Sequence, residues 1–161
     1  MCSSDLRAHG LRALSDGELY SAFDITYDYD IWDVWRRALR VEMPLSGYLE
    51  RLRLQDAIYP VNALKLRCVE NHDQERIMAA APSRDAALAW TAFASFNRGP
   101  LMIYAGQESG ARKRPSLFDI DRVDWADYPL QEFIRKVTVL KKPPAQRDGR
   151  LTLAHSGAFL L

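Results

Sequence analysis

Two periodicities of apolar residues alternate along the chain. Apolar and polar residues alternate singly over 23–28 and 63–69, which predicts strands, and a short continuous apolar run predicts a buried strand over 101–105. Apolar residues also recur three and four positions apart, as on one face of a helix. This spacing predicts helices from Asp30, as the cap, to 39, between Pro44 and Pro60, over 84–96 with Ser83 as the cap, and over 129–141. Residues 150–160 alternate again like a strand.

The order of these elements predicts the fold class. Strands that alternate with helices are typical of a parallel sheet with crossover helices. A complete (β/α)8 barrel takes about 250 residues, so 161 residues hold only part of one. We therefore expect an α/β fold, a partial (β/α)8 TIM barrel of about its last three β/α units, followed by the start of a C-terminal β domain. An independent small α/β domain is the alternative.

The ends of the chain suggest how it is divided. The first residues, MCSSDL, look like a translated sequencing-library adapter, so we interpret 1–6 as a non-native scar and the chain as a metagenomic fragment. The barrel portion would then run over 7–142 and the C-terminal β domain would begin within 143–161. No basic segment followed by an apolar stretch marks a signal peptide. We expect a bacterial protein of the cytoplasm that continues upstream.

Composition narrows the choice of partners. Hydrophobic residues make up 48% and charged residues 27%, which is ordinary for a globular protein. The net charge of +1 offers no electrostatic attraction to nucleic acid or an anionic membrane, so neither is an expected partner. Two cysteines, Cys2 and Cys68, do not form a disulfide framework, and Cys68 is expected to be a small buried hydrophobe.

Polar clusters follow the ends of the first three predicted strands, at 27–30, 70–73 and 106–108. The carboxyl ends of parallel strands meet at one rim, where α/β proteins place their chemistry. We therefore expect one site there. From the residues alone, a surface turn with no functional role explains the second cluster as well as a site does, since Asn and Asp favour turn positions.

Simpler interpretations apply to several other polar and aromatic residues. Asp28 and Asp30 are interpreted as turn and helix-cap residues, and the run 112–114, RKR, as a solvated loop. A metal site has little support, because no second histidine stands at ligand spacing from His72. Three tryptophans within predicted helices are expected in the core, and they are Trp32, Trp35 and Trp90.

Four segments carry a resemblance to a known family. The strand that ends in VENHDQERI, the run PLMIYAGQESG, the segment SLFDIDRVDW and the segment FDITYDYDIWDVW resemble glycoside hydrolase family 13, the α-amylase family. The likeness covers roughly 11–142 and keeps the order and spacing of the family's motifs. Asn-His-Asp followed about thirty residues later by IYAGQE is its most specific part.

The resemblance implies roles for individual residues. Asp73 matches the carboxylate that stabilises the transition state, and His72 and Asn71 match residues that bind the substrate. Tyr104, Glu108 and Tyr27 match positions that keep the strand ends in shape. Ala105 departs from the family, which often has a second aromatic there. No metal ligand or cofactor is implied by these residues, although calcium is common in the wider family.

The resemblance also implies a reaction. Such enzymes are retaining hydrolases of α-glucans or malto-oligosaccharides and need a nucleophilic and an acid/base carboxylate about 5 Å apart. Nothing in the chain resembles the two motifs that supply them, so we expect the isolated chain to be inactive. A catalytically silent, amylase-like binding or scaffolding subunit is the alternative. The oligomeric state is left open.

Overall fold

The computed structural model describes residues 16–125, 127–147, 149–156 and 159–160. The expected scar at 1–6 lies outside these residues. The chain divides into two compact units, Met1–Leu66 with Thr152–Leu161, and Arg67–Leu151.

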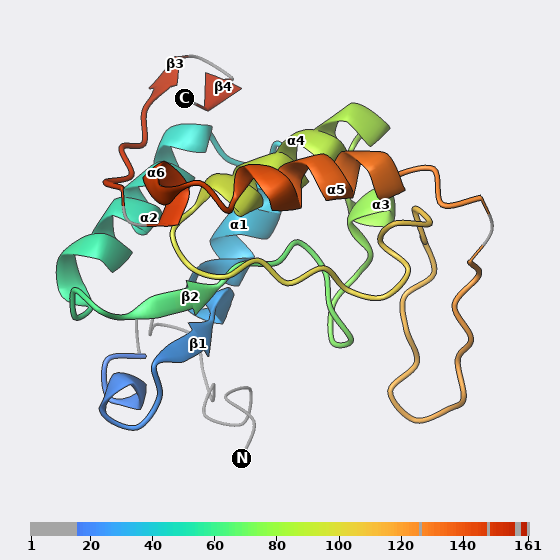
Figure 1. The fold of residues 1–161 in the computed structure, drawn as a ribbon, viewed down its shortest axis with the longest axis horizontal. Coiled ribbons are helices and arrows are strands. Elements are labelled where there is room, and N and C mark those ends of the chain that lie inside the picture. The colour runs from blue at the N-terminus through green and yellow to red at the C-terminus, as the bar shows by residue number, and fades with distance from the viewer. Residues whose placement is uncertain (1–15, 126, 148, 157–158, 161) are drawn as a thin grey trace. The chain divides into compact units, whose positions relative to one another are not determined.

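The first unit contains a short parallel sheet and a helical pair. Strands β1 (Ile25–Tyr27) and β2 (Leu64–Leu66) are labelled in Figure 1. They pair in parallel, and Ile25 lies opposite Leu64. Between them lie a 3-10 turn η3 (Asp28–Ile31) and helices α1 (Trp32–Leu39) and α2 (Leu45–Ile58). A 3-10 turn η2 (Leu19–Ser21) precedes β1. Near the C-terminus β3 (His155–Ser156) pairs antiparallel with β4 (Phe159–Leu160), in the region expected to be extended.

The helical faces predicted from periodicity form the core of this unit. Helices α1 and α2 pack on each other, and their buried residues include Trp35, Leu39, Leu49 and Leu52. Trp32 is also buried, with its ring 4.6 Å from that of Trp35. The predicted core positions of these two tryptophans are confirmed.

Two details of the first strand differ from the prediction. Ile25 is 45% exposed whereas Thr26 is 6% exposed, because Thr26 faces a buried polar cluster around Lys65. Asp30 does not cap a helix. Ile31 occupies the cap position of α1, and the Asp30 carboxylate instead forms an ion pair with Lys65 in the buried polar cluster.

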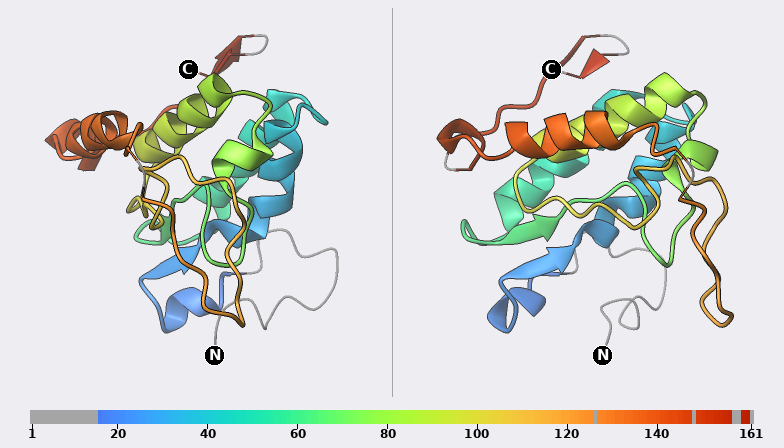
Figure 2. Two further views of the ribbon diagram at one scale, coloured as in Figure 1. Left: turned by 90° about the vertical axis from the view of Figure 1, so that its right-hand side faces the viewer. Right: turned by 45° about the vertical axis from the view of Figure 1, so that its right-hand side comes forward.

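The second unit is built on two long helices. Helices α4 (Arg84–Phe96) and α5 (Gln131–Leu140) lie side by side (Figure 2), with the short helices α3 (Ile77–Ala80) and α6 (Pro144–Arg147) at other points of the chain. Ser83 caps α4 as predicted, since its Oγ accepts a hydrogen bond from Ala86 N at 3.1 Å. Trp90 is buried on α4, which confirms its predicted place.

The third predicted strand is shorter than expected. Only Leu101 takes part in strand pairing, through a parallel bridge to Arg67. Residues 101–104 are half-buried, so the prediction of a strand buried on both faces over 101–105 is wrong. After this bridge the chain runs through a long loop to α5 (Figure 2). Among the described residues, no helix has the length and apolar character needed to cross a membrane.

Candidate functional site

The Asn-His-Asp sequence lies in a tight turn that a buried ion pair closes at its base. Glu70, directly before the turn, is fully buried, and its Oε1 accepts a hydrogen bond from an Arg76 guanidinium nitrogen at 2.8 Å. Its Oε2 accepts from the Ile77 backbone N–H at 2.8 Å. Both carboxylate oxygens of Glu70 therefore already accept hydrogen bonds from within the protein. Burial raises the pKa of the Glu70 carboxyl, with Arg76 and the Ile77 N–H acting in the opposite direction.

Asn71 holds the turn from inside. It is fully buried, and its Oδ1 accepts a hydrogen bond from the Asp73 backbone N–H at 2.9 Å. Its Nδ2 donates to the Cys68 Sγ at 3.8 Å, and Cys68 is buried as predicted. This burial favours a role in shaping the turn over the direct substrate contact expected for Asn71.

His72 and Asp73 point outward from this anchored turn. Their side chains are 48% and 28% exposed, and His72 Nε2 lies 3.4 Å from Asp73 Oδ1. The backbone beneath these two side chains is held by Asn71 and by the Glu70–Arg76 ion pair, so the turn presents a partly accessible imidazole and carboxylate from a fixed base.

The end of the third strand segment packs beside the turn. The Arg76 guanidinium lies over the Tyr104 ring, 4.6 Å from its centroid, and donates to the Ala105 carbonyl at 2.8 Å. Gly106 follows with φ +93°, and a Cβ there would come within 2.8 Å of Val123. Glycine meets both demands at this position.

The Glu108 side chain folds back on its own segment, two residues upstream. Its Oε2 accepts from the Gly106 N–H at 3.0 Å, and its backbone carbonyl accepts from the Leu130 N–H at 2.9 Å. Such contacts suit a residue that keeps a strand end in shape. Tyr27, expected in the same kind of role, lies in the first unit, where its ring stacks on Tyr29 at 5.0 Å.

A cleft opens in the second unit next to Arg76. Its volume is ≈ 320 Å³, and it is lined by Tyr104, Arg112, Lys113, Asp121 and others. The run 112–114 is exposed, as predicted for a solvated loop. Arg114, however, donates to the Asp73 carbonyl at 2.9 Å, a contact that the sequence did not signal.

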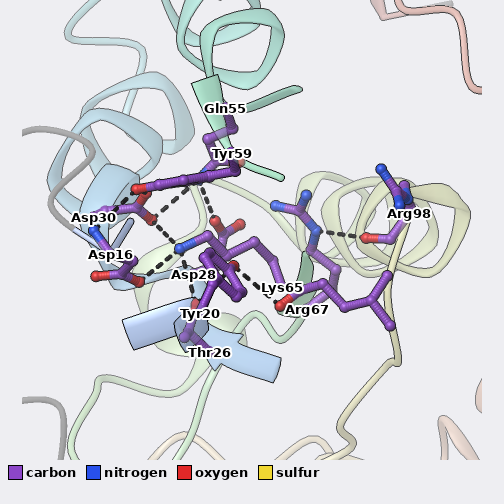
Figure 3. Close-up of polar contacts among 11 residues, drawn as sticks. Asp16, Tyr20, Thr26, Asp28, Asp30, Gln55, Tyr59, Lys65, Arg67 and Arg98 are labelled. Atoms are coloured by element: carbon purple, nitrogen blue, oxygen red, sulfur yellow. Dashed lines mark hydrogen bonds and ion pairs between the residues drawn. The ribbon is translucent and has the colours of Figure 1, made fainter. Parts of the chain in front are cut away.

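The first unit holds a second buried polar cluster (Figure 3) that the sequence did not predict. Lys65, with 4% of its side chain exposed, pairs with Asp16 at 2.6 Å and with Asp30 at 3.2 Å. Tyr59 donates to the other Asp30 oxygen at 2.7 Å, and Gln55 bridges Asp28 and Asp30. We interpret the cluster as structural, because two carboxylates compensate the Lys65 ammonium group and all of these contacts lie within the first unit.

Within the part of the chain that the structure describes, no group of three or more His, Cys, Asp or Glu side chains is arranged to hold a metal ion.

Comparison with known proteins finds similarity among solved structures. No family model matches the chain, and no curated protein matches it. Solved structures do match. An α-amylase from Lactobacillus plantarum is 38% identical with a TM-score of 0.78, over 94% of this chain and 36% of that one. A noncanonic maltogenic α-amylase from Thermotoga neapolitana is 31% identical with a TM-score of 0.75, over 86% of this chain and 33% of that one.

The chain belongs to the α-amylase family, glycoside hydrolase family 13. This confirms the resemblance carried by the motifs and sets aside an unrelated small α/β domain. A more distant structure, the cyclic α-maltosyl-(1→6)-maltose hydrolase of Arthrobacter globiformis, shares the fold at 24% identity and a TM-score of 0.73, over 84% of this chain and 33% of that one. The α-amylase family has a (β/α)8 barrel, and the parallel pairing of β1 with β2 agrees with part of one. The chain spans about a third of the length of the α-amylases that it matches.

Proposed function

We propose that this chain supplies the C-terminal part of a retaining α-glucan hydrolase, about its last three β/α units, and contributes Asp73 to the active site. One observation carries the proposal: the Asn-His-Asp turn is anchored by buried contacts, while the His72 side chain is exposed and the Asp73 side chain is partly exposed. The 38% identity to the L. plantarum α-amylase supports the same assignment.

Asp73 acts in this proposal as a fixed carboxylate beside the sugar at the cleavage point. A retaining glycosidase passes through an oxocarbenium-like transition state, and hydrogen bonds to sugar hydroxyls that strengthen in that state lower its barrier. The outward Asp73 carboxylate accepts such bonds, and the neighbouring His72 imidazole donates or accepts one more. The nucleophile and the acid/base carboxylate come from parts of the enzyme outside this chain.

The substrate class follows from relatives. The T. neapolitana protein is described as a maltogenic α-amylase, and an A. globiformis relative was solved in complex with maltose. We therefore assign α-linked glucans or malto-oligosaccharides as the substrate class of the complete enzyme.

A chimeric enzyme tests the assignment. The segment of the L. plantarum α-amylase that matches this chain is replaced by the chain itself, and hydrolysis of maltodextrin is followed. We expect an active chimera, and we expect Asp73→Asn to lower kcat by about 100-fold or more, because one preorganised polar contact to a transition state is worth about that much.

A matched control fixes the interpretation. Asp85→Asn changes an exposed carboxylate in the first turn of α4 and should leave kcat unchanged. A folded chimera in which Asp73→Asn retains full activity would remove Asp73 from the site. A folded chimera with no activity at all would instead favour a silent, glucan-binding relative, which maltose titration would then reveal.

A further inference from the structure

Two arginine side chains link the Asn-His-Asp turn to the loop after the third strand segment through hydrogen bonds. Arg76, at the base of the turn, donates to the carbonyls of Ala105 at 2.8 Å and Lys113 at 3.3 Å. Arg114, the next residue in that loop, donates back to the Asp73 carbonyl at 2.9 Å. We call Arg76 and Arg114 the arginine clasp.

The arginine clasp supplies the second of two hydrogen bonds that fix the Asp73 backbone. The Asp73 N–H is bound by Asn71 Oδ1 and its carbonyl by Arg114, so both of its peptide groups are fixed. One anchor belongs to the turn and the other to the loop. The direction of the Asp73 side chain therefore depends on the loop as well as on the turn.

The two arginines differ in burial, and this separates their contributions. Arg76 is 3% exposed and pairs with the fully buried Glu70, so it also supports the fold. Arg114 is exposed and reaches a carbonyl rather than a buried charge. An exposed side chain can be truncated at little cost in stability.

We propose that Arg114 is a positioning residue for Asp73: the clasp transmits the position of the 105–114 loop to the Asp73 carboxylate. Resting on the proposed function, this adds a residue whose role the family resemblance did not include. A misplacement of 1 Å in a reacting constellation can cost about 100-fold in rate, so a single lost anchor is enough to matter.

The first arm of the test uses the 161-residue chain. The Asp73 carbonyl belongs to the same peptide group as the Gln74 N–H, so loss of the Arg114 contact should move the Gln74 ¹⁵N resonance and speed exchange of the Asp73 amide. Arg114→Met should do both without changing the melting temperature, and Arg114→Lys should restore part of the shift. Arg135→Met removes another exposed arginine, whose guanidinium pairs with Glu132 on the same helix, and serves as control. Unmoved Gln74 and Asp73 signals would overturn the proposal.

The second arm uses the active chimera. Arg114→Met should lower kcat by at least about tenfold with KM within about twofold, because the carboxylate is misplaced rather than removed. Glu70→Gln with Arg76→Met removes the buried pair together, leaves no uncompensated charge, and should lower kcat similarly. An unchanged kcat in Arg114→Met would overturn the proposal. An inactive parent chimera would instead count against the proposed function, while the resonances of the first arm still decide whether the loop anchors the turn.

Discussion

Lys65 shows how a single residue decides local structure against its sequence pattern. It stands between Leu64 and Leu66 in β2, where alternation places a lysine on the solvent side, yet 4% of its side chain is exposed. Asp16 and Asp30 provide the compensating charges, and Tyr59 contributes its ring 4.7 Å from the ammonium group. A buried lysine with such partners remains charged.

Replacing Lys65 should cost far more than replacing a surface lysine. Lys65→Met leaves the Asp30 carboxylate buried without a cation, and breaking a buried pair in this way costs about 3–5 kcal/mol in the free energy of unfolding. Urea denaturation at pH 7 measures the loss. Lys113→Met breaks an ion pair of similar length whose lysine is 79% exposed, and should cost less than about 1 kcal/mol.

The same comparison predicts a pH dependence. Burial lowers the pKa of Lys65, but the Asp30 and Asp16 carboxylates more than offset it, so the net pKa lies above its ordinary value of 10.5. The folded state therefore holds this proton more tightly than the unfolded chain does. The stabilisation is complete below pH 10.5 and is lost as the pH rises through the higher folded pKa. The stability difference between wild type and Lys65→Met should shrink in that range, and a constant difference would contradict the assignment.

At the scale of elements, local signals predicted the helices well and the strands poorly. Ser83 marks the start of α4 because a capping oxygen needs only a backbone N–H three residues away. The third strand was overestimated, because an apolar run such as 101–105 does not reveal whether a neighbour is present to pair with it. The local pattern assigns Asp30 to a helix cap. Its actual partner, Lys65, lies far along the chain, where no local pattern can reveal it.

Lys141 links the ends of the two long helices and makes a prediction at this scale. Its ammonium group donates to the carbonyls of Ser95 at 2.7 Å and Asn97 at 2.6 Å, at the end of α4. Burial lowers its pKa, and the nearby Arg67 charge adds to this. Lys141→Met should therefore destabilise the chain by about 1–3 kcal/mol, since charged hydrogen bonds to carbonyls that would be left unsatisfied are lost.

Urea denaturation and amide exchange at the end of α4 measure this effect. The Asn97 N–H, which bonds to the Phe93 carbonyl, should exchange faster in the variant. Lys142→Met, at the exposed neighbouring lysine, is the control. Equal stability of the two variants would show that Lys141 does not hold the helix ends together.

For the molecule as a whole, the motifs predicted the family and the turn that carries Asp73, but not what holds that turn. Asn-His-Asp and IYAGQE are recognisable because their side chains are specific. Arg76 and Arg114 act on backbone carbonyls, which every residue possesses, so their partners leave no trace in the sequence. The anchoring of a site is in this case visible only in three dimensions.

The surface of the isolated chain leads to the last prediction. Phe118 and Ile120 are each 95% exposed on a loop in which side-chain oxygens of Ser116 and Asp121 accept hydrogen bonds from backbone N–H groups. The net charge is only +1, so electrostatic repulsion between copies is weak. Exposed apolar side chains favour association when this repulsion is weak.

Sedimentation velocity should show self-association that rises with concentration. The double change Phe118→Ser with Ile120→Ser should reduce it, because the two apolar side chains are removed. The loop should keep its shape, because the Phe118 and Ile120 side chains make none of the hydrogen bonds that hold it. Val61→Ser, at another exposed apolar residue, should have little effect, and an equal reduction by both changes would mean that general hydrophobicity, rather than this loop, drives association.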